Sequence, residues 1–565
     1  MHADQTKGIF RSLRTIVTLS LLLLSLLAVP AISQAATPVI FYSDLDSGPN
    51  TGGENNNGVY VTIWGNNFGA TRSGGSVTVG GGQVNNYPLW SDTKITFQLG
   101  SSAATGNIVV TASNGTSNGI PFTVRSGRIL FVTPTGTGNG SVGSPMSPSA
   151  AYAGIQPGDT YYFRAGTYSG QYGAAYGTNN YGLGPTKSGT AGNPVAFVGY
   201  PNEAAVFQNS GTNFSMRDND PVDAHANYIT IANFTLIGGG SCVAGAGVTI
   251  GGGQVAKSGA YGMRVIGNVM SATYGSANTM TGLVTVNGDA NRILGNEFKD
   301  TGAEPAINNN HIIYVSLGAS DVDIGWNYIH DVIVGHVIQV HTDAFFSYYN
   351  VRIHDNVIAK GLTGDSRGIN IGNANGDSYG SIYNNIIDSV GQNFSAIAMY
   401  SGSWKVYNNT IYNAHASSSM VWVSNLVQQF GGAAGWSQPT ADIRNNIFYS
   451  DGQSPYVAAV NGASMSQLTL SNNLYYNHGA APSQDPAAVT ADPLFINPLV
   501  SDFHLQSAAS ASSPAIDHGS SVVNTVVSMD HDGNPRPQGA GFDSGAYESA
   551  GPSLPSPNNL TLRRL

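Results

Sequence analysis

The sequence has 565 residues, a net charge of −10, one cysteine and 72 glycines, and only 10% of its residues are charged. A single cysteine excludes an internal disulfide, and an acidic chain argues against nucleic acid as a partner. Few charges and many glycines are poor material for surface helices and favour a β-rich protein.

Residues 1–36 are expected to lie outside the fold. Basic residues in MHADQTKGIFRSLR precede the apolar run IVTLSLLLLSLLAVP, and the small residues SQAA follow it. This order is typical of a secretory signal peptide. We therefore expect a secreted protein, extracellular or periplasmic, with no membrane span in the rest of the chain.

Residues 37–126 alternate short β-branched strands with Gly/Asn turns, as in VYVTIWGNNFG, KITFQL and GNIVVTASNG. Strands of this length and spacing predict a β-sandwich of roughly a hundred residues. The order of these segments resembles an IPT/TIG domain. The resemblance implies an immunoglobulin-like fold, and no catalytic motif stands out within it.

The remaining chain repeats one motif: an aliphatic residue, two positions, Asn, one position, and another apolar residue. Examples are VIGNVM, IHDNVI and IRNNIF, and a looser copy is IANFTL. The copies lie about 30 residues apart on average, without helical periodicity. They predict the coils of a parallel β-helix, in which each asparagine takes a left-handed corner and its amide bonds to the next coil's asparagine. These asparagines are Asn233, Asn268, Asn296, Asn327, Asn356, Asn385, Asn409, Asn446 and Asn473.

The repeat region resembles the pectate-lyase-like superfamily of right-handed parallel β-helices. RILFVTPTGTGNG, from Arg128, resembles the first coil of such proteins, and DPLFINPLVSDFHLQ with SPAIDHG resembles their closing segment. The predicted fold class is all-β: an immunoglobulin-like sandwich, then a right-handed parallel β-helix over residues 127–548. A disordered tail is expected at residues 549–565.

One strand of each coil can be aligned without gaps. The aligned segments are GLVTVN (282–287), HIIYVS (311–316), HVIQVH (336–341), RGINIG (367–372), SAIAMY (395–400) and SMVWVS (419–424). Their third and fifth residues are apolar and are expected in the core. The opposite face then collects histidine, tyrosine, arginine and amide side chains from neighbouring coils about 4.8 Å apart.

These side chains suit acid–base chemistry on a sugar carboxylate, because imidazole and phenol carry protons while guanidinium and amide groups bind carboxylates. We predict as catalytic residues His311, Tyr314, His336 and Arg367. We predict as substrate-binding residues Gln339, His341, Asn370, Tyr400 and Trp422. The superfamily resemblance implies polysaccharide lyases and glycoside hydrolases, and we favour a lyase that cleaves a uronic-acid-containing glycan by β-elimination.

Two alternatives stay open. An inverting glycoside hydrolase needs two carboxyl groups, and the nearest candidates in the loops are Asp343, Asp365 and Glu304. A non-catalytic glycan-binding or surface structural protein is the other. In all three cases the expected partner is an extracellular polysaccharide, and the protein is expected to be a monomer.

No metal or other cofactor is expected. His336 and His341 are five residues apart, so a flat strand would point them to opposite sides, and no zinc-like spacing is present. The proposed groove lacks an acidic cluster, so calcium is possible but unsupported. His330 lies in a different column and is expected to be structural. Mixed charges four positions before the asparagines, such as Asp323 and Arg352, are expected to form a solvated face with weak ion pairs.

Overall fold

The computed structural model describes most of the chain. The described residues are 36–169, 172, 187–208, 222–224, 226–238, 243–245, 261–272, 281–300, 310–332, 335–341, 346–359, 367–372, 376–390, 394–414, 416, 418–425, 439–508 and 510–551. The predicted signal peptide, apart from Ala36, and most of the predicted tail lie outside them. No helix within the described residues is long and apolar enough to cross a membrane.

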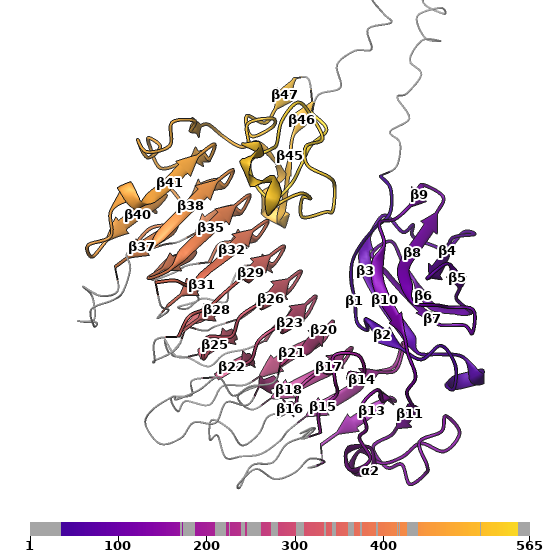
Figure 1. Ribbon diagram of the computed structural model, residues 1–565. Helices are drawn as coiled ribbons and strands as arrows, with labels where there is room; N and C mark the ends of the chain where they lie inside the picture. The colour runs from indigo at the N-terminus through magenta and orange to yellow at the C-terminus, as the bar shows by residue number, and fades with distance from the viewer. Residues whose placement is uncertain are drawn as a thin grey trace, which may run out of the picture.

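The N-terminal domain is a two-sheet β-sandwich (Figure 1, indigo). One sheet has the order β1-β3-β7-β6; the other has the order β2-β10-β8-β4-β5, with β9 paired to β8. The strands are β1 (Val39–Ser43), β2 (Ser47–Gly48), β3 (Tyr60–Asn66), β4 (Ser76–Val79), β5 (Gly82–Gln83), β6 (Asn86–Trp90), β7 (Lys94–Gln98), β8 (Gly106–Ala112), β9 (Gly115–Thr116) and β10 (Ile120–Val124), with the 3₁₀ turn η1 (Glu54–Asn56). The predicted immunoglobulin-like sandwich is confirmed.

The rest of the chain winds into a parallel β-helix with three long sheets, which Figure 1 shows as stacked rungs. The first sheet contains β11 (Ile129–Val132), β12 (Thr160–Phe163), β14 (Val195–Gly199), β17 (Ile229–Ala232), β20 (Arg264–Ile266), β23 (Arg292–Leu294), β26 (Asp323–Gly325), β29 (Val351–His354), β32 (Tyr379–Tyr383), β35 (Ser403–Tyr407), β38 (Thr440–Arg444) and β41 (Leu468–Ser471). Helix α2 (Pro148–Ala153) lies between its first two strands in sequence.

The second sheet follows the asparagine corners. It contains β13 (Gly166–Tyr168), β15 (Ala205–Gln208), β18 (Thr235–Gly238), β21 (Val269–Ala272), β24 (Glu297–Phe298), β27 (Tyr328–Ile329), β30 (Val357–Ile358), β33 (Ile386–Asp388), β36 (Thr410–Ala414), β39 (Ile447–Ser450), β42 (Leu474–Tyr476) and β43 (Val489–Thr490).

The third sheet carries the aligned segments of the sequence. It contains β16 (Val222–Ala224), β19 (Val243–Gly245), β22 (Thr281–Val286), β25 (Asn310–Val315), β28 (His336–Val340), β31 (Arg367–Ile371), β34 (Ile397–Met399), β37 (Val421–Ser424) and β40 (Val457–Val460). Apolar residues from all three sheets fill the interior as one cluster.

The asparagine ladder forms as predicted between the first and second sheets. From Asn268 to Asn473, each side-chain amide donates to the Oδ1 of the next asparagine at 2.9–3.1 Å. The last one, Asn473, donates instead to Asp485 at 2.8 Å. Buried polar groups need partners, and the ladder supplies them along the whole corner.

The predicted left-handed conformation of these asparagines is wrong. Positive φ angles fall on the residue before each one, such as Gly267 and Asn384. Asn233 is therefore also misassigned: its φ is 61°, and its backbone aligns with Gly267, so it is a corner residue outside the ladder. The corner residue is usually Gly, Asn or Asp because these tolerate the left-handed region, and Trp326 is the exception with a φ of 53°.

The sandwich packs against the outer face of the first sheet. Residues of both domains form one hydrophobic cluster, in which Tyr162 and Ile266 join the sandwich core. Trp326 stacks on Phe41 with ring centroids 5.5 Å apart. Arg264 donates to the Ser43 carbonyl at 2.8 Å. The outer face of the early coils is thus covered by the N-terminal domain.

After β43, the chain folds back along the outside of the coils (Figure 1, yellow). This closing segment contains β44 (Phe495–Asn497), β45 (Asp502–Leu505), β46 (Ser507–Ala508), β47 (Ala511–Ser512), η3 (Pro498–Val500) and η4 (Ser521–Thr525), and the turn η2 (Met465–Gln467) precedes it. Its apolar residues cover the second sheet through one cluster and the first sheet through another.

The closing segment also meets the sandwich. The Asn66 side chain donates to the Asp532 carbonyl at 2.9 Å. A Cβ on Gly533 would lie 2.6 Å from Phe41 and 2.7 Å from Val39, so only glycine permits this close approach. The two ends of the described chain are therefore clamped together beside the first sheet.

Candidate active site

The register of the third sheet matches the sequence alignment residue by residue. His311 pairs with His336, and His336 pairs with Arg367, so the three residues form one column across consecutive strands. Three residues further along the strands, Tyr314 pairs with Gln339, and Gln339 pairs with Asn370. The predicted core columns are also confirmed, since their members from Ile313 and Val315 through Val421 and Val423 are at most 1% exposed.

The strands of this sheet bend near their first residues. Ile312 and Ile313 are consecutive, yet both are fully buried in the helix core, and Val337 and Ile338 repeat the pattern on the next coil. A flat strand cannot point two adjacent side chains inward. The bend turns the preceding histidine outward, and the His311 ring accordingly stacks on Tyr314 with centroids 4.9 Å apart.

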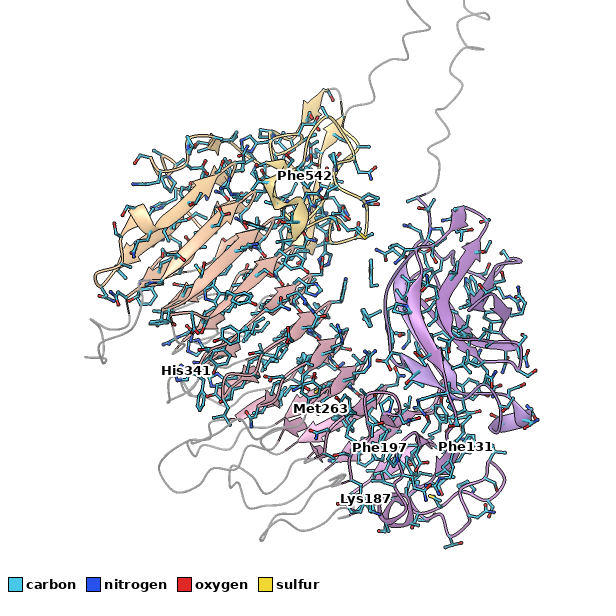
Figure 2. The ribbon with its side chains drawn as sticks, in the orientation of Figure 1. Phe131, Lys187, Phe197, Met263, His341 and Phe542 are labelled. Carbon is cyan, nitrogen blue, oxygen red and sulfur yellow. The ribbon has the colours of Figure 1, made fainter. Side chains whose placement is uncertain are left out.

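The bend corrects the prediction that His336 and His341 point to opposite sides. His336 stacks on His311 with centroids 5.8 Å apart, and after burial, which is the main cause, repulsion from His341 also lowers the pKa of both. All three imidazoles thus lie close to one another on the outer face. Figure 2 shows His341 on the flank of the coils away from the sandwich.

His341 lies over the next coil because that coil offers a glycine. A Cβ on Gly372 would come within 2.3 Å of the His341 Nδ1 atom. Any larger residue at this position would push the imidazole away. Gly372 thereby positions His341 beside the column that continues to Tyr400.

Three polar atoms on neighbouring coils are buried without a hydrogen-bond partner among the described residues. They are His336 Nδ1, Gln339 Oε1 and Asn370 Oδ1. The residues are 5–6% exposed. Buried polar atoms are normally satisfied, and clusters that are not mark places where a ligand completes the bonding.

Both paired histidines are held neutral. Burial, together with the nearby His341, lowers the pKa of His311 to about 3. Burial, then His311, Arg367 and His341, lowers the pKa of His336 well below its usual value. A neutral imidazole can accept a proton, which an imidazolium cannot.

Arg367 leads from the histidines to an aromatic cluster. Its guanidinium lies 5.0 Å from the ring centroid of Phe394. Phe394 contacts Trp422 edge-on at 4.7 Å, and Trp422 contacts Tyr400 at 5.0 Å. Trp422 is only 6% exposed, so Tyr400 offers more of its ring to a ligand. Burial raises the pKa of Tyr400 to about 12.

Phe394 was missed in the sequence, because it stands one residue before the aligned segment 395–400. Its aromatic side chain, next to the column that holds Arg367, was the signal in the sequence that could have identified it. The three carboxylates proposed for hydrolysis (Glu304, Asp343 and Asp365) lie outside the described residues. His330 lies on the second sheet's side, bonded to Asp331 at 2.7 Å, in keeping with the structural role expected of it.

Among the described residues, the third-sheet face offers no ligand set that fits a calcium ion. Calcium takes six to eight oxygen ligands, largely carboxylates. The described side chains that approach one another here are imidazoles, amides, a phenol and a guanidinium. Nowhere in the described part of the chain do three His, Cys, Asp or Glu side chains group closely enough to hold a metal ion.

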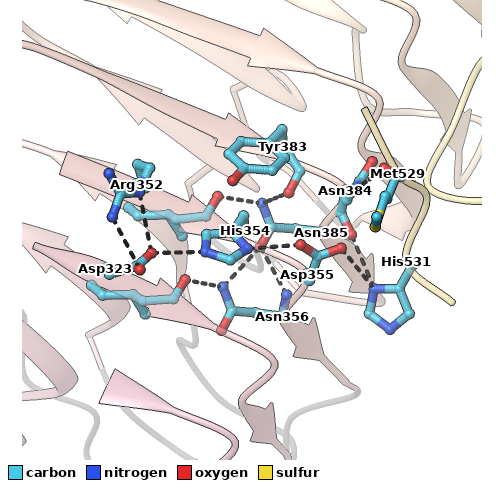
Figure 3. Close-up of polar contacts among 12 residues, drawn as sticks. Asp323, Arg352, His354, Asp355, Asn356, Tyr383, Asn384, Asn385, Met529 and His531 are labelled. Atoms are coloured by element: carbon cyan, nitrogen blue, oxygen red, sulfur yellow. Dashed lines mark hydrogen bonds and ion pairs between the residues drawn. The ribbon is translucent and has the colours of Figure 1, made fainter. Parts of the chain in front are cut away.

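A second histidine cluster lies under the first sheet's outer face (Figure 3). His354 is bonded through Nδ1 to Asp355 at 2.7 Å and through Nε2 to Asp323 at 2.8 Å. Burial lowers its pKa, but the two carboxylates raise it to about 9. Asp323 is 7% exposed and also binds Arg352 at 3.0 Å, so the predicted solvated face with weak ion pairs is wrong here.

A family comparison agrees with the fold of the N-terminal sandwich. Residues 46–124 match the IPT/TIG domain family. A comparison of the sequence with curated proteins found no match. Pectate and rhamnogalacturonan lyases are among the similar solved structures. The pectate lyase is 16% identical, covers 75% of this chain and 96% of its own, and gives a TM-score of 0.47.

The rhamnogalacturonan lyase is 14% identical over 70% of this chain and 97% of its own, with a TM-score of 0.41. A protein named XylC, solved with xylose, is 11% identical over 74% and 99%, with a TM-score of 0.39. At these identities, and with TM-scores below 0.5, these likenesses say nothing about the reaction. The candidate chemistry therefore rests on the side chains of the third sheet.

Proposed function

We propose that this protein is a polysaccharide lyase that cleaves a uronic-acid-containing glycan by β-elimination on the outer face of the third sheet. The observation that carries the proposal is the set of unsatisfied polar atoms on consecutive coils, His336 Nδ1, Gln339 Oε1 and Asn370 Oδ1. They stand beside a cation, Arg367. A hydroxylated, negatively charged sugar supplies partners for all of them.

Arg367 is the group that binds the substrate carboxylate. A guanidinium forms paired hydrogen bonds with a carboxylate and stabilises the negative charge that develops on it after proton loss. The amides of Gln339 and Asn370 accept hydrogen bonds from sugar hydroxyl groups and fix the ring against the sheet. Charge stabilisation is strong here because the neighbouring side chains are buried.

His336 is the base. Its imidazole is neutral before substrate binds, because burial, His311 and Arg367 lower its pKa, and the arriving carboxylate offsets the positive charge of Arg367. The base therefore strengthens when the substrate is present. His336 takes the proton from C5, next to the carboxylate, as the C5–H bond breaks.

Tyr314 is the acid. Its phenol donates a proton to the glycosidic oxygen as the C4–O bond breaks and the C4=C5 double bond forms. His336 then returns its proton to Tyr314 through solvent or His311, whose ring contacts both residues. No water is consumed, and one product carries an unsaturated uronate conjugated with its carboxylate.

The test is a screen of the purified protein on pectic, alginate and neutral polysaccharides. Ultraviolet absorbance and new reducing ends would be recorded together, and the masses of the products would be measured by mass spectrometry. Elimination gives rising absorbance and a product lighter by one water than the hydrolysis product. Reducing ends without absorbance would overturn the proposal in favour of hydrolysis, and no change on any substrate would favour a binding protein.

A matched control separates the third sheet from the rest of the molecule. His330 is a histidine of the second-sheet side, bonded to Asp331 and Glu297. His330→Ala should keep the elimination activity that His336→Ala loses. Equal activity in the two variants would contradict the assignment of the base.

A further inference from the structure

A groove of about 460 Å³ lies on the outer face of the first sheet, far from the third-sheet chemistry. Its floor comes from β29, β32 and β35, and its wall comes from Thr525 and Val526 at the end of η4. Ligand sites for small molecules commonly have volumes of this size.

The floor of the groove carries two cations in one column. Arg352 pairs with Ser381, and Ser381 pairs with Lys405, so the cations stand two strand spacings, about 10 Å, apart. None of the described residues that line the groove bears a carboxylate. Within the described part of the chain, the Lys405 side chain makes no hydrogen bond or ion pair, and it is exposed.

The groove also offers aromatic and hydroxyl groups. Tyr379 is 49% exposed, and Tyr383 forms part of the same lining. Ser381 stands between Arg352 and Lys405 in their column, and Ser403 pairs with Tyr379. Exposed aromatic rings bind the apolar faces of sugars, and hydroxyl groups bind sugar hydroxyls.

Buried residues hold this lining in place (Figure 3). Asp323 fixes Arg352 by an ion pair at 3.0 Å and is itself bonded to His354. The His354 ring stacks on Tyr383 with centroids 4.9 Å apart and planes 6° apart. A lining fixed in advance loses little conformational freedom when it binds a ligand.

We propose that this groove is a second binding site, which holds one or two acidic sugar residues of a glycan without cleaving them. Lys405 and Arg352 bind the carboxylates, and Tyr379 stacks on a sugar ring. The site itself rests on the groove, whereas the expectation that its ligand is the same uronate glycan rests on the proposed function. It would keep the enzyme attached to its polymer.

The experiment is isothermal titration calorimetry on the full chain carrying His336→Ala, so that no ligand is cleaved. The probes are trimers of galacturonate, mannuronate or guluronate, and a neutral sugar trimer is the control for each. Adding Lys405→Ala or Tyr379→Ala should raise the Kd of the acidic trimers for the groove by at least about tenfold. Lys299→Ala removes the same charge on the second-sheet side, where Lys299 pairs with Glu297, and should leave binding as it was.

Unchanged affinity and stoichiometry in both groove variants would overturn the proposal, and so would equal binding of the neutral trimers. Lys405-dependent binding by a protein that shows no elimination would uphold the groove and reject the proposed function. Elimination without Lys405-dependent binding would support the proposed function and reject the groove as a binding site. Because Lys405 is exposed, an unchanged unfolding midpoint is expected and confirms that the variant folds.

Discussion

Two sheets of the same β-helix bury histidines in opposite states. On the third sheet, His311 and His336 are buried beside other positive or titratable groups, and their pKa values fall. On the first sheet, His354 is buried between Asp323 and Asp355, and its pKa rises to about 9. Burial alone therefore does not distinguish a catalytic histidine from a structural one. The groups bonded to its two ring nitrogens make the distinction.

A histidine with a carboxylate on each nitrogen has no atom left for a substrate. His354 is of this kind, and it fixes the residues around it. The Nδ1 atom of His336 has no partner among the described residues, so a ligand can reach it chemically. Under the proposed function, the comparison separates a stabilising cluster on the first sheet from a catalytic one on the third, and four experiments would break or sharpen it.

The largest effect is expected from His336→Ala and Tyr314→Phe, which remove the proposed base and the proposed acid. General acid–base groups contribute about 10²- to 10⁴-fold, so kcat/KM for elimination should fall by that factor in each variant. The rate of absorbance increase measures it. Circular dichroism should be unchanged, and full activity in both variants would reject the third sheet as the active site.

His354→Ala should destabilise the protein by about 3–5 kcal/mol, because it leaves two buried carboxylates without their shared partner. The free energy of unfolding from denaturant titration measures the change. His330→Ala, at a partly exposed ion pair, should cost less. If the two substitutions destabilise the protein equally, the His354 cluster has no special role.

The pH dependence of stability should differ in sign between the sheets. His311 has a folded pKa of about 3, below the 6.5 of an unfolded chain, so the unfolded state gains protons first and stability falls below pH 6.5, by about 2 kcal/mol at pH 5. His354 has a folded pKa of about 9, so its contribution is complete below pH 6.5 and is lost, by about 3 kcal/mol, as the pH rises through 9.

Unfolding midpoints of His311→Asn and His354→Asn across this pH range check the two slopes. The first variant should lose the part of the acid slope that His311 contributes, while His336 keeps its own part. The second should lose the part of the alkaline slope that His354 contributes, while His504 keeps its own part. Slopes that persist unchanged in both variants would mean that other groups control the pH dependence.

The smallest effect is expected from Arg292→Ala. Arg292 binds the same Asp323 carboxylate at 2.8 Å, but its side chain is 46% exposed. Exposed ion pairs contribute about 1 kcal/mol or less. A loss in the free energy of unfolding as large as that of His354→Ala would contradict the distinction between the buried and exposed partners of Asp323.

Much of the fold could be predicted because its signals are local. The asparagine motif and the apolar columns at Ile313 and Val315 fix one residue per coil, and parallel pairing then carries the register across the sheet. The bend at Ile312 could not be predicted, because two adjacent apolar residues read the same in a strand that runs straight. It reversed the expected relation of His336 to His341.

The first-sheet cluster was missed for a different reason. The charges at Asp323 and Arg352 were visible in the sequence, but their burial comes from segments far away in the chain. Trp326, in contact with Phe41 of the sandwich, illustrates such packing. Local patterns predict which face a side chain occupies, and only tertiary packing determines whether water reaches that face.

The clamp between Asn66 and Asp532 joins residues 466 positions apart. Coils of a β-helix contact only their neighbours and can stack in order as the chain emerges, N-terminal end first. The clamp cannot form until almost the whole chain has emerged, because Asp532 lies near its C-terminal end. Contacts this distant in sequence also form slowly. We therefore expect the sandwich to fold early and to dock on the first coils. The closing segment then binds to it in the last step of folding.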